Sequence, residues 1–241
     1  QALYPAGTSL SVFMLAAALD GDLPTVPSSQ KSWLDGRAID CTVDTPVDAD
    51  WPTLVARGCP AGTLSLASAF DQATLTAFYD FLGFYSEPAV PLYADFNELP
   101  AILPEFNHLA LGMQGVDVSP LQLALAAASI SAGGVKPVPR PALSVNTPES
   151  GWVFLPVEGL PQALFTPEQA NATADLLKVR SQPFWQSMGS APLSDQRTIL
   201  WYLGGTMPNW SGTPLVVVVL LEKNAPYLAE HIGQALLQAA Q

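Results

Sequence analysis

An uninterrupted apolar run near the C-terminal end limits the possible folds most strongly. The run LVVVVLL occupies residues 215–221. It is far shorter than the roughly 20 residues that a membrane-spanning helix needs, and its β-branched valines favour a buried strand. A second strand-like segment, TILWYLGG at 198–205, precedes it, and the intervening TMPNWSG suits a hairpin. The sequence therefore predicts two adjacent core strands.

Several segments have the periodicity and end signals of helices. Thr8 or Ser9 can cap the first of them, and Ser119, Pro120 and the Gly133-Gly134 pair delimit a later one. The helical segments expected are 8–19, two helices within 64–82 ending at Gly83, 119–132, 167–178 and 226–239. Segments 20–62, 86–107 and 135–165 are expected to be loop-rich and irregular. Helices followed by a hairpin and a last helix predict an α+β fold with a small antiparallel sheet.

Composition excludes several functional classes. Hydrophobic residues make up 49% of the chain, which is ample for a core and excludes disorder. The chain has 9 Lys and Arg against 21 Asp and Glu, a net charge of −12, so nucleic acid is not an expected partner. His108 and His231 are too far apart to form a metal site with the two cysteines, and no cofactor is expected. Asp44, Asp48 and Asp50 lack the following Gly and distal Glu of a calcium loop, which favours a solvated acidic loop.

The two cysteines, Cys41 and Cys59, bracket that acidic loop. They are either two unrelated buried thiols or a disulfide that closes a separation of 18 residues. A disulfide would place the protein in an oxidising compartment outside the cytoplasm.

Four segments together resemble the transpeptidase domain of penicillin-binding proteins. YPAGTSLSVFMLAAAL (4–19) resembles the segment that opens the nucleophile helix of that family, and GMQGVDVSPLQLALAAASISAGGVKPVP (112–139) resembles its GQG…TPLQ…NGG segment. WYLGGTMPNWSGTPLVVVVLLE (201–222) is similar to its paired core strands, and 41–70 to the Cys-bracketed approach to its second motif. The resemblance implies a β-lactamase-like transpeptidase fold. It implies a single domain over 1–241, with a helical lobe over about 8–180, a sheet hairpin with the C-terminal helix over about 185–241, and without the family's early strands.

The family's acyl-transfer chemistry uses three motifs, S-x-x-K, S-x-N and K-T-G. Carried onto this sequence, Thr8 takes the nucleophile position and Ser11 the position of the basic lysine. Counting back from Gly83 puts Phe70 and Gln72 at the second motif; a shift of two residues would make Ser68 the remnant hydroxyl and put Phe70 at the amide position. In QSMGSAP (186–192), Ser187 replaces the lysine that binds the substrate carboxylate, followed by Met188, Gly189 and Ser190. All three motifs are altered.

Other interpretations of these residues remain open. Thr8, Ser9 and Ser11 also suit a helix cap and small packing positions, and Asp71 suits a cap or an exposed acid rather than one wall of a cleft. Ser187 and Ser190 are expected on an edge strand facing solvent, the alternative being a groove in which an extended ligand pairs with residues 187–191. Trp185, Trp201 and Trp210 are expected to pack around the hairpin. The segment SSQK (28–31) satisfies S-x-x-K literally, but no apolar helix follows it.

These observations lead to the hypothesis of a pseudoenzyme. The resemblance implies an extracytoplasmic scaffold or binding module in cell-wall assembly or sensing, with a cell-wall peptide or protein as partner. It also implies that any membrane attachment lies in a segment upstream of this chain. One alternative is a divergent D,D-transpeptidase or acyl hydrolase that uses Thr8 or Ser9. The other is a module that binds peptides or muropeptides beside Ser187.

Overall fold

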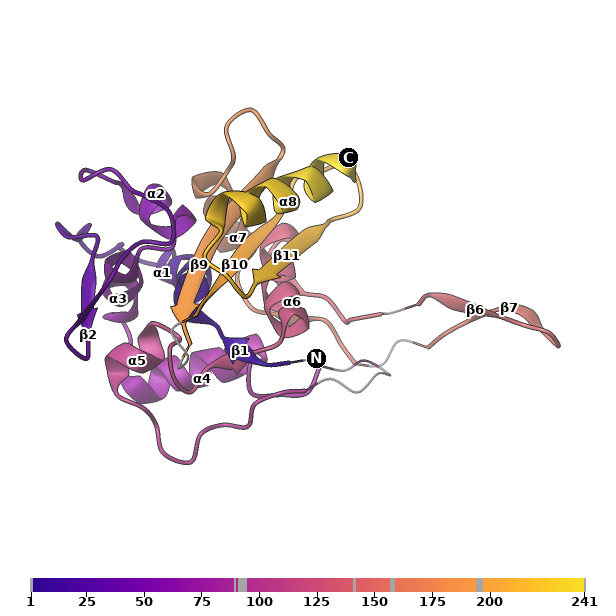
Figure 1. Cartoon of the computed structure of the whole chain (residues 1–241). Helices are drawn as coiled ribbons and strands as arrows, with labels where there is room; N and C mark the ends of the chain where they lie inside the picture. The colour runs from indigo at the N-terminus through magenta and orange to yellow at the C-terminus, as the bar shows by residue number, and fades with distance from the viewer. Residues whose placement is uncertain are drawn as a thin grey trace.

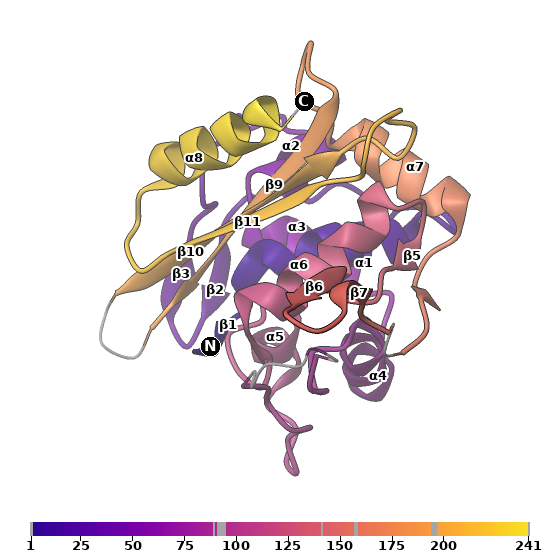
Figure 2. The same cartoon turned by 90° about the vertical axis from the view of Figure 1, so that its right-hand side faces the viewer.

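The computed structural model describes residues 2–88, 90, 95–140, 142–156, 159–193 and 197–240. A three-stranded antiparallel sheet in the order β11-β10-β9 forms its centre. In Figures 1 and 2, α8 lies across one face of this sheet, and the other helices lie mainly on the opposite side. The sheet strands are β9 (Phe184–Pro192), β10 (Thr198–Thr206) and β11 (Val216–Leu221). The α+β fold expected from the sequence is confirmed.

Helices account for much of the remaining chain. The helices are η1 (Gly7–Leu10, 3-10), α1 (Ser11–Ala18), α2 (Trp51–Ala56), α3 (Pro60–Ala67), α4 (Gln72–Leu82), α5 (Phe106–Ala110), α6 (Pro120–Ser131), α7 (Pro167–Leu176) and α8 (Pro226–Ala239). No helix in the described ranges is long and apolar enough to cross a membrane. Gly83 ends α4 in the left-handed conformation, as predicted. Helix α2 was not predicted, since its six residues lie in the segment 20–62 that reads as loop.

The side chains of β10 point alternately to the two faces of the sheet, and both faces are covered. Trp201 and Leu203 belong to the main core with α1 and α6, whereas Leu200 and Tyr202 pack with Ala229 of α8. Because successive strand residues point to opposite faces, the apolar run of β10 supplies both layers. Trp185 and Trp201 are buried, as expected, while Trp210 is half-buried.

The short strands form four two-stranded ribbons outside the main sheet. They are β1 (Tyr4–Pro5) with β4 (Asp117–Val118), β2 (Ser32–Leu34) with β3 (Arg37–Ile39), β5 (Val135–Lys136) with β8 (Gln162–Ala163), and β6 (Ser144–Thr147) with β7 (Gly151–Phe154). The β6–β7 ribbon stands clear of the body (Figure 1), with Trp152 70% and Phe154 80% exposed. These segments are too short for their residue pattern to distinguish a strand from a loop.

Ser119 caps the start of α6 as the sequence predicts, and the structure shows that Gln122 completes a capping box with it. The Ser119 hydroxyl accepts the Gln122 N–H at 3.3 Å, and the Gln122 side chain accepts the Ser119 N–H at 2.9 Å. The Gln122 amide also donates to the carbonyls of Gly83, Phe84 and Ser86, which ties α6 to the end of α4.

We expect Ser119→Ala to lower the free energy of unfolding by about 1 kcal/mol, because it removes the side-chain acceptor of a helix N-cap. Chemical denaturation followed by circular dichroism measures this loss. Ser68→Ala is the control, since the exposed Ser68 hydroxyl only donates to the Ser65 carbonyl within its own helix end. Equal stability of the two variants would contradict the capping role.

Candidate functional site

The first-motif residues lie in the turn that leads into α1, and all of them are enclosed. Thr8 is 1% exposed, and Ser9 and Ser11 are fully buried. The Ser9 hydroxyl donates to the Ala6 carbonyl at 2.6 Å and the Ser11 hydroxyl to the Thr8 carbonyl at 2.8 Å. The Thr8 hydroxyl oxygen accepts the backbone N–H of Ser190 at 3.0 Å. These hydroxyls therefore hold the turn together and attach it to β9.

The third-motif residues lie on β9, the edge strand of the sheet. The expectation that Ser187 faces solvent is wrong: its side chain is 0% exposed and its hydroxyl donates to the Val55 carbonyl at 2.9 Å. The end of α2 packs on this edge and covers it. Ser190 is half-buried, and its hydroxyl accepts from Thr42 at 2.9 Å. The structure thus brings Thr8, Ser187 and Ser190 together, but in a closed arrangement.

Two glycines allow this close packing. A Cβ on Gly189 would lie 2.3 Å from the Ser9 nitrogen, so η1 rests directly on the β9 backbone. Gly58 has φ +59° in the turn between α2 and α3, and a Cβ there would lie 2.6 Å from the Met188 carbonyl oxygen and 3.0 Å from the Thr8 hydroxyl. The turn at Gly58 therefore forms a roof over Thr8.

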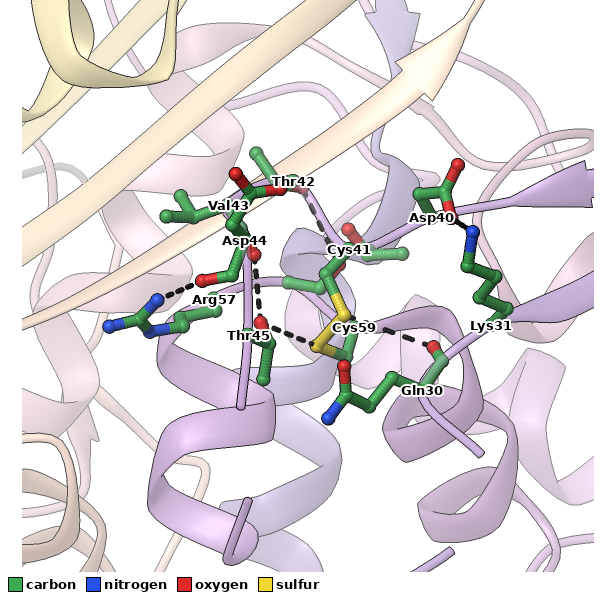
Figure 3. Close-up of a disulfide and its surroundings, with 12 residues drawn as sticks. Gln30, Lys31, Asp40, Cys41, Thr42, Val43, Asp44, Thr45, Arg57 and Cys59 are labelled. Carbon is green, nitrogen blue, oxygen red and sulfur yellow. Dashed lines mark hydrogen bonds and ion pairs between the residues drawn. A yellow bond between two sulfur atoms is a disulfide. The ribbon is translucent and has the colours of Figure 1, made fainter. Parts of the chain in front are cut away.

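A disulfide holds this roof in place. Cys41 and Cys59 are joined with an S–S distance of 2.06 Å, which confirms the disulfide alternative. Figure 3 shows the bond beside the segment that contains Thr42 and Val43. Thr42 and Val43 donate their backbone N–H groups to the carbonyls of Gly58 and Arg57, at 3.3 and 3.2 Å. The cross-link thus fastens both segments that cover Thr8.

The residues carried onto the second motif have contacts elsewhere. Phe70 stacks on Phe78 at a ring distance of 5.5 Å, and the Gln72 amide donates to the Pro104 carbonyl. Asp71 caps α4 by accepting the Thr74 N–H at 2.7 Å, and that hydrogen bond lowers the pKa of its carboxyl. The segment packed against Thr8 and Ser187 is instead Val55–Cys59. The sequence signal for it is the Gly-Cys-Pro step at 58–60, where a glycine precedes a half-cystine at a helix start.

The lysines and His108 in the described residues have surroundings other than the three hydroxyls. Lys31 pairs with Asp40 at 2.7 Å, and Lys136 donates to the Leu82 carbonyl. Lys178 and Lys223 are exposed, and His108 bonds Asp35 at 3.0 Å. Within the described ranges, no lysine, histidine or carboxylate is hydrogen-bonded to the hydroxyls of Thr8, Ser9 or Ser11. A general base for a nucleophile is thus not in contact with any of these groups.

The acidic loop is ordered by capping and backbone contacts. Asp50 accepts the Thr53 N–H at 3.0 Å at the start of α2, and this hydrogen bond lowers the pKa of its carboxyl. The Asp44 carbonyl accepts from Arg57, as Figure 3 shows. These contacts assign structural roles to Asp50 and to the Asp44 backbone.

Comparison with known proteins gives a clear result at the level of structure. No protein-family model matches the chain, and no curated protein matches it. Penicillin-binding protein A from M. tuberculosis, solved as an imipenem acyl-enzyme complex, superposes with a TM-score of 0.79 at 21% identity, covering 99% of this chain and 60% of that one. The D,D-transpeptidase domain of a peptidoglycan glycosyltransferase from Eggerthella lenta gives 0.79 at 17% identity, covering 99% of this chain and 65% of that one.

A third match agrees with these two. Penicillin-binding protein 3 from M. tuberculosis, complexed with aztreonam, gives a TM-score of 0.77 at 15% identity, covering 100% of this chain and 63% of that one. The chain thus spans less than two thirds of the length of these structures. It has the fold of a penicillin-binding protein transpeptidase domain.

Proposed function

We propose that this chain is a transpeptidase-fold domain without acyl-transfer activity, which serves peptidoglycan assembly as a scaffold or binding module. Its structural neighbours include a peptidoglycan synthetase from Bifidobacterium adolescentis and acyl-enzyme complexes of penicillin-binding protein A. The Cys41–Cys59 disulfide supports a location outside the cytoplasm, because such bonds persist in oxidising compartments.

The enclosure of Thr8 is the observation that carries the proposal. Attack on an acyl group requires a nucleophile that a substrate can reach and a base within hydrogen-bonding distance of it. Thr8 is 1% exposed, and the turn at Gly58 packs over it. An acyl-transfer site also needs free N–H donors for the oxyanion. The Ser190 N–H beside Thr8 is already directed to the Thr8 hydroxyl.

We expect incubation with a fluorescent penicillin to give no covalent adduct, because no hydroxyl of this site is both accessible and activated. Intact-mass spectrometry after prolonged incubation is the measurement, with the Eggerthella lenta D,D-transpeptidase domain treated in parallel as the positive control. An adduct mapped to Thr8 or Ser9 would refute the proposal and support the divergent-enzyme alternative. Thr8→Ala then distinguishes the two positions, because only an adduct on Thr8 would disappear.

A further inference from the structure

One backbone edge near the closed site is unpaired. Strand β3 pairs only with β2, through a two-residue turn in which Asp35 and Gly36 have φ of +51° and +74°. In such a hairpin the residues that flank the turn, Leu34 and Arg37, exchange hydrogen bonds, and the next pair along does not. The backbone N–H and C=O of Ala38 therefore point away from β2. Asp40 lies one residue past the end of β3, and continuing the same alternation would point its backbone groups the same way.

These backbone groups have no partner in the described chain. No hydrogen bond to the N–H or C=O of Ala38 or Asp40 occurs among the described residues, and both residues are exposed. The unbonded N–H and C=O groups of Ala38 and Asp40 lie two residues apart. An additional strand can form hydrogen bonds with backbone groups at this spacing.

A groove runs along this edge. Consecutive residues 37–42 line a cavity of about 560 Å³ whose opposite wall includes Ser190, Pro192 and Thr198. A second cavity of about 690 Å³ shares Asp40–Thr42 with it and continues to Thr45 and Tyr227. Both odd- and even-numbered residues of 37–42 line the first cavity. Since alternate residues of a strand point to opposite faces, the cavity follows the edge of the strand and not one face. We call residues 37–42 with this cavity the β3 groove.

The edge of β9, where the sequence suggested a ligand strand, is largely covered. The Ser187 hydroxyl donates to the Val55 carbonyl, and the Ser190 N–H donates to the Thr8 hydroxyl. An extended ligand that enters this region therefore finds its free hydrogen-bonding groups on β3.

The side chains beside the edge specify the chemistry of the ligand. Trp33 lies opposite Ala38 on the same face of the hairpin and is 71% exposed. Because Ala38 is small, an apolar side chain on an added strand would pack over it against Trp33. Asp40 projects on this face two residues further on, where it forms an exposed ion pair with Lys31, shown in Figure 3. With a net charge of −12 on the chain, a basic residue suits that position.

The geometry points to the β3 groove as a strand-addition site for an extended L-peptide segment of a protein partner. The segment carries an apolar or aromatic residue opposite Ala38 and a basic residue two positions away, opposite Asp40. This inference rests on the proposed binding role, but the backbone groups that pair with the ligand belong to β3 and not to the closed site, with which the groove shares Thr42 and Ser190.

The test uses the fluorescein-labelled heptapeptide Thr-Lys-Thr-Phe-Thr-Lys-Thr, which presents the pattern in both strand directions. Titration with the whole chain, followed by fluorescence anisotropy, is expected to show saturable binding, and the same peptide with glutamate in place of both lysines is expected to bind at least several-fold more weakly. Hydrogen exchange of the Ala38 and Asp40 amides is expected to slow when the peptide is bound, because these amides become hydrogen-bonded.

A proline variant tests the groove edge of the hairpin. Ala38→Pro removes the outward N–H on the groove side and is expected to weaken binding roughly tenfold, the usual effect of losing one hydrogen bond plus local fit. Gly21→Ala is the control, because nothing lies within 4 Å of a Cβ at this position outside the groove, and it is expected to bind the peptide as the unmodified chain does. Absence of saturable binding, or binding without protection of Ala38 and Asp40, would overturn the inference. Binding of a disaccharide pentapeptide but not of the heptapeptide would do so as well. The penicillin experiment would be unaffected by any of these outcomes.

Discussion

Replacing Gly189 by alanine is expected to destabilise the domain by about 3 kcal/mol or more, the upper range for overpacking at a site that cannot relax. The new methyl group would lie 2.3, 2.6 and 2.7 Å from the nitrogen, Cα and Cβ of Ser9. Two of these atoms are backbone, so no side-chain rotation removes the clash. The turn η1 must move away from β9, which also breaks the hydrogen bond from Ser190 to Thr8.

Thermal unfolding followed by circular dichroism measures this effect. For a chain of this length, about 3 kcal/mol corresponds to a fall in Tm of roughly 6–12 °C. Gly21→Ala is the matched control, because nothing lies within 4 Å of a Cβ at Gly21, and its effect should stay within about 0.5 kcal/mol. If the Gly189→Ala and Gly21→Ala variants have the same Tm, η1 does not pack on β9 as closely as the structure indicates.

Removing the Cys41–Cys59 disulfide is the second change with a large expected effect. Closure of an 18-residue separation contributes about 3 kcal/mol in the chain-entropy account. The double variant Cys41→Ala/Cys59→Ala should therefore unfold at markedly lower denaturant concentration. Because the bond fastens Thr42 and Gly58, hydrogen exchange of the Thr42 and Ser190 amides should also become faster.

Reduction of the unmodified chain with dithiothreitol provides an independent measurement of the same bond. Reduced protein and the double variant should show similar stability, and the reductant should leave the double variant unchanged. Stability that is equal with and without the disulfide would mean that hydrogen bonds such as Thr42 N–H to Gly58 hold the roof by themselves.

The sequence predicted the parts of the fold that depend on local signals. Ser119 as an N-cap indicated the start of α6, Gly83 indicated the end of α4, and the valine run predicted β11 beside β10. Family-like spacing of Gly and Pro indicated the transpeptidase fold although identity with the solved structures is 14–21%.

Long-range burial could not be predicted in the same way. A serine on an edge strand is polar and was expected to face solvent, but Ser187 is covered because α2, in a segment without a helix signal, packs on β9. Likewise, counting back from Gly83 led to Phe70 and Gln72, whereas the turn at Gly58 is the segment that contacts Thr8. Contacts between residues 50 to 180 positions apart depend on tertiary packing, which a local pattern does not specify.

The burial of positions 11 and 187 leaves no room for the lysines that the family motifs carry there. Reactivity of the family type would need a lysine at each position, yet both are fully enclosed. An ammonium placed there without a partner carries a large desolvation penalty, and at position 187 it would displace the hydrogen bond to Val55. A lysine introduced at either position is therefore expected to lower the stability of the chain unless the α2–α3 turn is repacked around it.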